Sequence, residues 1–147
     1  MPKIEGPTYS VDIDWDKDGK PVLYVIARGR VTAPKNALDV IGKAVDMTNE
    51  GPHQHVCAVY NMLEVTQVPF LGRFINSGRF PSTTRTAHII LGTVNPALRL
   101  VGSLAAVANS KRLRTLDVCT TQADVDASVK RWLSLPDRAR EYNIHNI

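Results

Sequence analysis

The chain contains 147 residues, of which 44% are hydrophobic and 22% are charged, and its formal net charge is +4. These values are typical of one soluble globular domain, and they exclude a small scaffold that depends on disulfides to fold. The two cysteines, Cys57 and Cys119, lie in apolar, strand-like runs without a CxxC spacing, so we expect buried thiols in a reducing compartment.

The first predicted element is a β-hairpin. Tyr9–Trp15 alternates apolar and polar side chains, as a half-buried strand does, and Pro21–Ala27 is a more continuously apolar strand. Between the two strands, Asp18-Gly19 is a strong turn signal, because glycine tolerates the positive φ that such turns need.

The same turn also matches the first half of an EF-hand calcium loop through Asp14, Asp16, Asp18 and Gly19. The bidentate glutamate that closes such a loop would fall at position 25, which is Val25, and no helix is predicted on either side. The sequence therefore favours a plain hairpin turn.

Helices and strands alternate after the hairpin. The first helix is predicted to begin at Pro34 and to end before Gly51, with Leu38, Ile41 and Val45 on its inner face. The remaining predicted elements are a strand over 55–60, a loop over 61–67, a helix over 69–78, a strand over 86–91, a helix over 95–109, a strand over 113–118 and a helix over 121–135.

The last helix has the clearest pattern. Thr121 and Asp124 resemble a capping box at its start, and Pro136 ends it. Its predicted inner stripe consists of Val125, Val129, Trp132 and Leu133. Residues 136–147 are polar and are predicted to form a flexible tail.

The order of elements predicts an α/β fold. It consists of a mixed, mostly parallel sheet of about five strands, with an N-terminal β-hairpin and four helices. The sequence contains no repeat, linker or low-complexity segment, so we expect a single domain over residues 1–147.

Four segments together resemble the STAS domain family, known from anti-sigma-factor antagonists and the cytoplasmic ends of sulfate transporters. These segments are Val22–Arg30, Val56–Asn61, His88–Arg99 and Thr115–Asp124. The resemblance implies a SpoIIAA-like fold and a regulatory role. In the antagonists, the signature is an acidic residue followed by Ser or Thr at the start of the helix after the third strand, and the hydroxyl of that Ser or Thr is phosphorylated. Here Thr66 is the nearest hydroxyl and Glu64 the nearest carboxylate, so this chain departs from the family signature. The resemblance makes Thr66 the candidate for phosphorylation in this chain.

The charges are distributed unevenly along the chain. Residues 65–116 contain no acidic side chain, and they contain seven basic ones: Arg73, Arg79, Arg85, Arg99, Lys111, Arg112 and Arg114. This segment is either a solvated basic surface or a region that attracts anions. No aromatic stripe accompanies the arginines, so nucleic acid is not an expected partner.

Candidate binding residues follow from the position of ligands in open α/β sheets, which lie beyond the carboxyl ends of the strands. The residues expected there are Asn61, Glu64, Thr66, Gln67, Thr93 and Asn95, with Arg73 and Arg99 as candidate contacts for an anion. The alternative is that these residues form helix caps and turns, which is favoured for Asn95 and Thr121.

The sequence offers no recognisable catalytic set. It lacks a GxSxG elbow, a P-loop and paired carboxylates, and His53 and His55 have no further metal ligand at a suitable spacing. His88 is expected to be a hydrogen-bonded core or edge histidine. We therefore predict no catalytic residues, no metal and no cofactor.

The favoured function is a non-catalytic STAS-like module for regulation and protein interaction in bacterial signalling, which binds a protein partner or a second copy. The predicted helix over 95–109 is apolar around much of its circumference, which fits deep burial or a partner contact. The alternative is a domain that binds a small anionic or amphipathic ligand, either lipid-like or nucleotide-like. The first residues resemble no signal peptide, and no apolar stretch is long enough to span a bilayer, so we expect a cytoplasmic protein with peripheral membrane contact left open.

Overall fold

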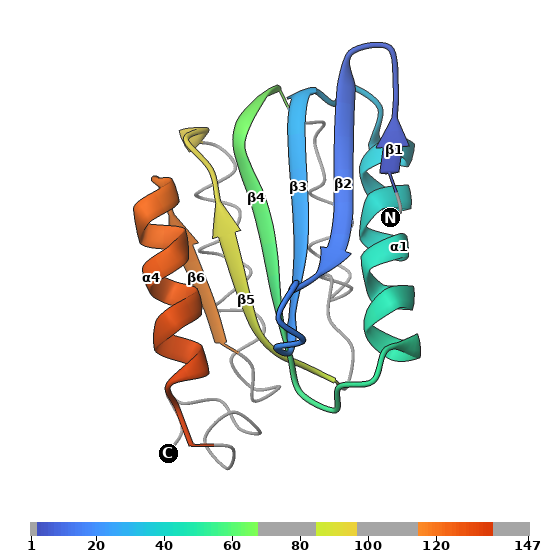
Figure 1. Cartoon of the computed structure of the whole chain (residues 1–147). Coiled ribbons are helices and arrows are strands. Elements are labelled where there is room, and N and C mark those ends of the chain that lie inside the picture. The colour runs from blue at the N-terminus through green and yellow to red at the C-terminus, as the bar shows by residue number, and fades with distance from the viewer. Residues whose placement is uncertain (1–2, 68–84, 97–114, 137–147) are drawn as a thin grey trace.

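A six-stranded mixed sheet with the order β1-β2-β3-β4-β5-β6 forms the centre of the computed structural model (Figure 1). The structure describes residues 3–67, 85–96 and 115–136. Its elements are β1 (Lys3–Glu5), β2 (Tyr9–Trp15), β3 (Val22–Arg30), α1 (Pro34–Glu50), β4 (Val56–Gln67), β5 (Thr86–Gly92), β6 (Thr115–Cys119) and α4 (Gln122–Leu133). The first three strands pair antiparallel and the strands from β3 to β6 pair parallel, which confirms the mixed, mostly parallel sheet.

The short strand β1 is an addition to the predicted five strands. Its three residues pair with Asp12, Val11 and Ser10 of β2. Three residues are too few to give a periodic pattern, so the sequence carried no signal for this strand. The helices predicted over 69–78 and 95–109, and the tail beyond residue 136, lie outside the described residues.

The turn between β2 and β3 is a plain hairpin turn. Gly19 has a φ of 77°, and the Asp16 carboxylate accepts hydrogen bonds from the backbone N–H groups of Asp18 and Lys20. This carboxylate is therefore used to fix the backbone, as in an Asx turn. This geometry agrees with the plain hairpin turn, which the sequence favours over a calcium loop.

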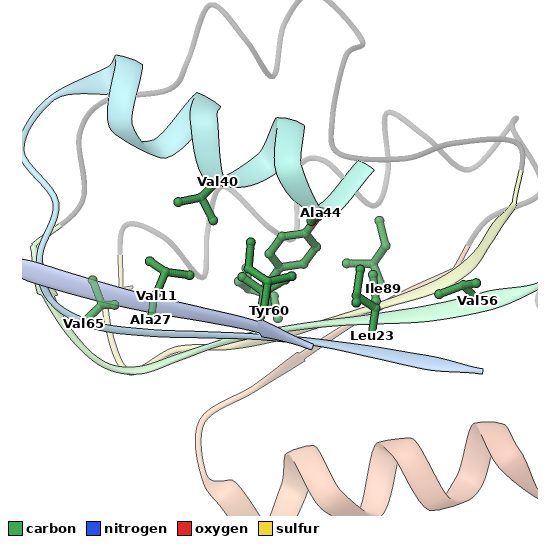
Figure 2. Packing of buried hydrophobic residues seen from close by; sticks show 13 residues of the cluster. Val11, Leu23, Ala27, Val40, Ala44, Val56, Tyr60, Val65 and Ile89 are labelled. Atoms are coloured by element: carbon green, nitrogen blue, oxygen red, sulfur yellow. The ribbon is translucent and has the colours of Figure 1, made fainter. Parts of the chain in front are cut away.

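Each face of the sheet packs against one of the two described helices. Figure 2 shows the first core between the sheet and α1, where Val40 and Ala44 lie over side chains such as Tyr60. The second core lies on the opposite face, between α4 and strands β4 to β6, and includes Val59, Ile90 and Trp132. Burial of these apolar groups provides the main driving force for the fold.

The inner face of α1 differs from its prediction. The buried positions are Val40, Ala44 and Thr48, whereas Leu38 is 39% exposed. The predicted inner face of Leu38, Ile41 and Val45 is wrong, because the direction from which the helix approaches the sheet decides which positions are buried. Thr48 is compatible with burial because its hydroxyl donates a hydrogen bond to the Ala44 carbonyl oxygen at 2.9 Å.

The predicted start and inner stripe of α4 are confirmed. The Thr121 side chain accepts a hydrogen bond from the Asp124 backbone N–H at 3.1 Å, and Val125, Val129 and Trp132 are buried. We expect Thr121→Ala to lower the free energy of unfolding by about 1 kcal/mol, because the first turn loses its cap. Chemical denaturation would measure this loss. Thr120→Ala is the matched control and should change stability by less than about 0.5 kcal/mol.

Both cysteines are free and buried, Cys57 in β4 and Cys119 in β6, as predicted. Burial is the main cause that raises the pKa of each thiol, so neither cysteine has the features of a reactive thiolate. Among the helices that the structure describes, none has the length and apolar character needed to cross a membrane.

Candidate interaction surface

The face of the sheet that carries α4 has a polar, accessible part over β2 and β3. It arises from the alternation in β2, which directs Val11 and Ile13 into the core and Asp12 and Asp14 to the opposite face. We call this region the front surface and define it by Asp12, Asp14, Tyr24, Ile26, Arg28, Asn61 and Glu64. Figure 1 shows β2 and β3 separated from α4 by β4 and β5, and Figure 2 shows α1 and α4 on opposite faces of the sheet.

Arg28 links three neighbouring strands on the front surface. Its Nε lies 2.7 Å from a Glu64 oxygen on β4, and its Nη1 lies 3.4 Å from an Asp12 oxygen on β2. The side chains of Arg28, Asp12 and Glu64 are 48%, 40% and 67% exposed. Solvent screening makes such ion pairs weak contributors to stability. The two contacts place the guanidinium between a carboxylate of β2 and a carboxylate of β4.

A β-bulge in β4 explains why Asn61 and Glu64 share this surface. Ile26 pairs with Asn61 and Arg28 pairs with Glu64, so β4 contains one residue more than β3 between these pairs. Met62 packs against the core under α1, and Leu63 packs against the core under α4. In a regular strand, residues three apart point to opposite faces, and the extra residue removes that difference.

Asn61 connects the bulge to α4. Its Oδ1 accepts a hydrogen bond from the Leu63 backbone N–H at 3.2 Å, and its Nδ2 donates to Gln122 Oε1 at 2.8 Å. The first bond stabilises backbone at a position where a bulge interrupts the ladder. The second bond joins the edge of the front surface to the first turn of α4.

A second irregularity follows within three residues. Gly29 pairs with Val65 and Arg30 pairs with Gln67, which leaves Thr66 as an additional residue in β4. Gly29 has a φ of 93°, and the Thr66 hydroxyl donates to its carbonyl oxygen at 3.4 Å. Thr66 is exposed and lies on a strand, so the prediction of a loop over 61–67 was wrong. Apolar periodicity ends before residue 61 because the bulges break the alternation.

The other predicted site residues do not join this group. Thr93 is fully buried, and its Oγ1 accepts a hydrogen bond from the Asn95 backbone N–H at 3.1 Å, which forms a local turn after β5. Gln67 lies at the end of β4, where its carbonyl oxygen accepts from Val31 N–H. Arg73 and Arg99 lie outside the described residues.

Several members of the front surface were not among the predicted site residues: Asp12, Asp14, Tyr24, Ile26 and Arg28. They belong to the first hairpin, whereas the predicted residues follow the strand ends of the middle region. The alternation of Asp12 and Asp14 with buried residues was a usable signal for a solvated sheet face.

A polar cluster on β5, β6 and α4 was also missed. The Asp117 carboxylate accepts a hydrogen bond from the Ser128 hydroxyl at 2.5 Å, and Nε2 of His88 lies 3.5 Å from the same oxygen. Arg131 Nη2 approaches this oxygen at 3.4 Å. His88 is buried beside the carboxylate, as expected for a hydrogen-bonded core histidine.

The hydrogen bonds of this cluster join α4 to the sheet and do not form a pair of nucleophile and base. A hydroxyl has one proton, and Ser128 donates it to Asp117, whereas a serine nucleophile would donate it to a base such as histidine. Ser128 is also only 1% exposed, so a substrate could not reach it. The hydrogen bond from His88 and that from Ser128 hold the pKa of Asp117 well below its usual range, against the opposite effect of burial.

One of the two loop histidines, His53, has an aromatic neighbour. His53 packs against Trp15, with ring centroids 5.2 Å apart. Within the three described ranges, no group of three His, Cys, Asp or Glu side chains is arranged to hold a metal ion.

Comparison with known proteins gives a similarity of fold. No protein-family model matches the sequence, and no curated protein matches it. Among solved structures, the chain is similar to an uncharacterized DUF3478-family protein from Shewanella loihica PV-4, which has a SpoIIAA-like fold. The match has 11% sequence identity and a TM-score of 0.49, and it covers 82% of this chain and 93% of that chain. At this identity the similarity extends to no activity or partner.

Proposed function

We propose that this protein is a non-catalytic, STAS-like regulatory module that binds a protein partner through the front surface. The observation that carries the proposal is the arrangement around Arg28, where an exposed guanidinium is held by carboxylates of two neighbouring strands beside half-buried Tyr24 and Ile26. Bacterial signalling is the setting that the STAS resemblance implies.

The composition of the front surface supports a protein partner. Protein interfaces combine aromatic and arginine side chains with a half-buried apolar centre and a polar rim. Tyr24 and Ile26 supply the centre on β3, and Asp12 and Glu64 supply charged groups on the flanking strands. Because Arg28 is already held by two partners, fixing its side chain on association costs little additional entropy.

The non-catalytic part of the proposal is supported by the way the polar groups are used. Asn61 bonds Gln122 and a backbone N–H, Thr66 bonds a backbone carbonyl, and Ser128 bonds a carboxylate. These are positioning interactions rather than an arrangement of nucleophile and base. The proposal includes a cytoplasmic location, with which two free, buried cysteines are compatible.

The alternative function, binding of an anionic or amphipathic small ligand, depends on Arg73 and Arg99, which lie outside the described residues. The described front surface favours the protein partner, because carboxylates surround its exposed arginine. An anion approaching Arg28 would be repelled by Asp12 and Glu64.

Affinity capture with two matched variants tests the proposed function. Ile26→Arg places a long cationic side chain in the centre of the front surface, whereas Leu38→Arg makes the same change on α1, on the opposite face. We expect wild type and Leu38→Arg to recover the same partner from a lysate of the source organism, and Ile26→Arg to recover at least about tenfold less.

Quantitative mass spectrometry would measure this recovery, with thermal unfolding used to establish that each variant is folded. If no protein is enriched by wild type and Leu38→Arg over Ile26→Arg, the proposed function is wrong.

A further inference from the structure

Carboxylates outnumber cations among the described residues on and beside the front surface. They come from four elements, and the cations Lys3 and Arg28 are bound to them. The carboxylates are those of Glu5, Asp12, Asp14, Glu64 and Asp126. Two further exposed cations adjoin these residues, Arg30 two positions after Arg28 on β3 and Lys130 one turn after Asp126 on α4. The five carboxylates therefore exceed the four cations by one, whereas the formal charge of the chain is +4.

These carboxylates lie on both sides of an apolar strip. Tyr24 and Ile26 occupy neighbouring same-face positions on β3, and their register partners on β2 are Asp14 and Asp12. On the other side lie Glu64 of β4 and Asp126 of α4. An apolar centre between two acidic borders is thus built from three strands and one helix.

The environment of Tyr24 agrees with this geometry. Burial is the main cause that raises the pKa of its phenol, and the carboxylates of Asp16 and Asp126 act in the same direction. These carboxylates approach from the hairpin turn and from α4. Negative potential is therefore present at the apolar strip itself as well as at its borders.

We infer that the front surface binds a Lys/Arg-rich segment of a partner protein that places apolar side chains over Tyr24 and Ile26. The inference rests on the proposed function and specifies its partner. Apolar side chains of the segment cover the strip, and its cations meet Asp12 and Asp14 on one side and Glu64 and Asp126 on the other. Such charge complementarity favours fast association and selects against acidic partners.

A defined peptide provides the test. The probe is a blocked, fluorescently labelled octapeptide, Lys-Lys-Leu-Lys-Lys-Leu-Lys-Lys, and the control peptide has glutamate in place of every lysine. The protein variants are Asp14→Asn/Asp126→Asn and the matched double variant Asp39→Asn/Asp46→Asn on α1, in which both aspartates are exposed. Both pairs change the net charge equally. Asparagine also keeps an acceptor oxygen for the Trp15 N–H and for Gln122.

We expect wild type to bind the lysine peptide and not the glutamate peptide, with affinity that falls as salt increases. The front-surface variant should raise the Kd by about fivefold to tenfold and the α1 variant by less than about twofold. In amide NMR spectra, the lysine peptide should shift signals of β2, β3 and β4. Equal Kd values for the two variants, or shifts confined to α1, would overturn the inference.

The two proposals can fail separately. If a lysate partner is lost with Ile26→Arg but the front-surface variant binds the peptide as the α1 variant does, the proposed function stands and the inference of a Lys/Arg-rich partner segment is wrong. If the peptide binds the front surface and no lysate partner depends on Ile26, the preference for a Lys/Arg-rich segment stands and the proposed function is wrong.

Discussion

Asp117→Ala is expected to lower the free energy of unfolding at pH 7 by about 3 kcal/mol, because it removes an acceptor shared by side chains from β5 and α4. The substitution takes the carboxylate away from the Ser128 hydroxyl, which is 1% exposed, and from the side of His88, which is 4% exposed. The cost arises mainly from these buried polar groups rather than from the exposed contact with Arg131. Urea denaturation of both proteins would measure the difference.

The matched control for this substitution is Asp126→Ala on α4, the helix that carries Ser128. Asp126 is exposed and accepts a hydrogen bond from Gln122 one turn earlier, so its loss should cost less than about 0.5 kcal/mol. If both substitutions cost the same, the cluster around Asp117 does not stabilise the contact between α4 and the sheet.

The pH dependence of the free energy of unfolding should show that Asp117 is ionised in the folded protein. Its pKa is lower in the folded protein than in the unfolded chain, so between these two values the unfolded state binds more protons. The stabilisation is therefore complete above the unfolded value of about 4 and is lost as the pH falls through the folded value. Asp117→Asn keeps an acceptor oxygen and cannot titrate, so its stability should fall less steeply than that of wild type between about pH 5 and pH 2. Parallel acid-dependent curves for the two proteins would contradict this assignment.

Gly29→Ala is the second substitution with a large expected effect, a loss of about 3 kcal/mol in the free energy of unfolding. Gly29 has a φ of 93°, which an alanine adopts only with strain, and a Cβ at this position would collide with the backbone oxygen of Thr8. That oxygen accepts a hydrogen bond from Arg30 N–H at 2.8 Å, so it cannot move away without breaking this bond. Differential scanning calorimetry would show the effect as a lower Tm.

Gly19→Ala separates the two contributions. Gly19 also has a positive φ, 77°, but nothing lies within 4 Å of the position that a Cβ would occupy. This substitution should therefore cost only the backbone strain, about 1 kcal/mol. A Gly29→Ala variant as stable as Gly19→Ala would show that the backbone of Thr8 can shift without cost.

Local sequence patterns were sufficient where one element determines its own structure. The alternation over Tyr9–Trp15 predicted β2, Asp18-Gly19 predicted the hairpin turn, and Thr121 predicted the start of α4. In each case the cause lies within a few residues, either in the period of the side chains or in a turn or cap. The strands predicted at 55–60 and 86–91 are also present, and their nearly continuous apolar character is matched by burial along their length.

Local patterns failed where the outcome depends on a neighbouring element. The residues from Asn61 to Gln67 continue β4, because β3 supplies pairing partners and the two irregularities accommodate the extra residues. Similarly, the buried stripe of α1 is set by its approach to the sheet, which favours Ala44 over larger apolar residues. Neither the pairing nor the approach is encoded in a short window of sequence.

The sequence by itself determined the class of this protein: an α/β domain with a mixed, mostly parallel sheet and buried thiols. Asn61 and Glu64 could be chosen as polar residues, but only the tertiary structure placed them on one surface with Arg28 and Asp12. The physical reason is that strand pairing brings together residues more than 30 positions apart, and a bulge decides to which face each side chain points.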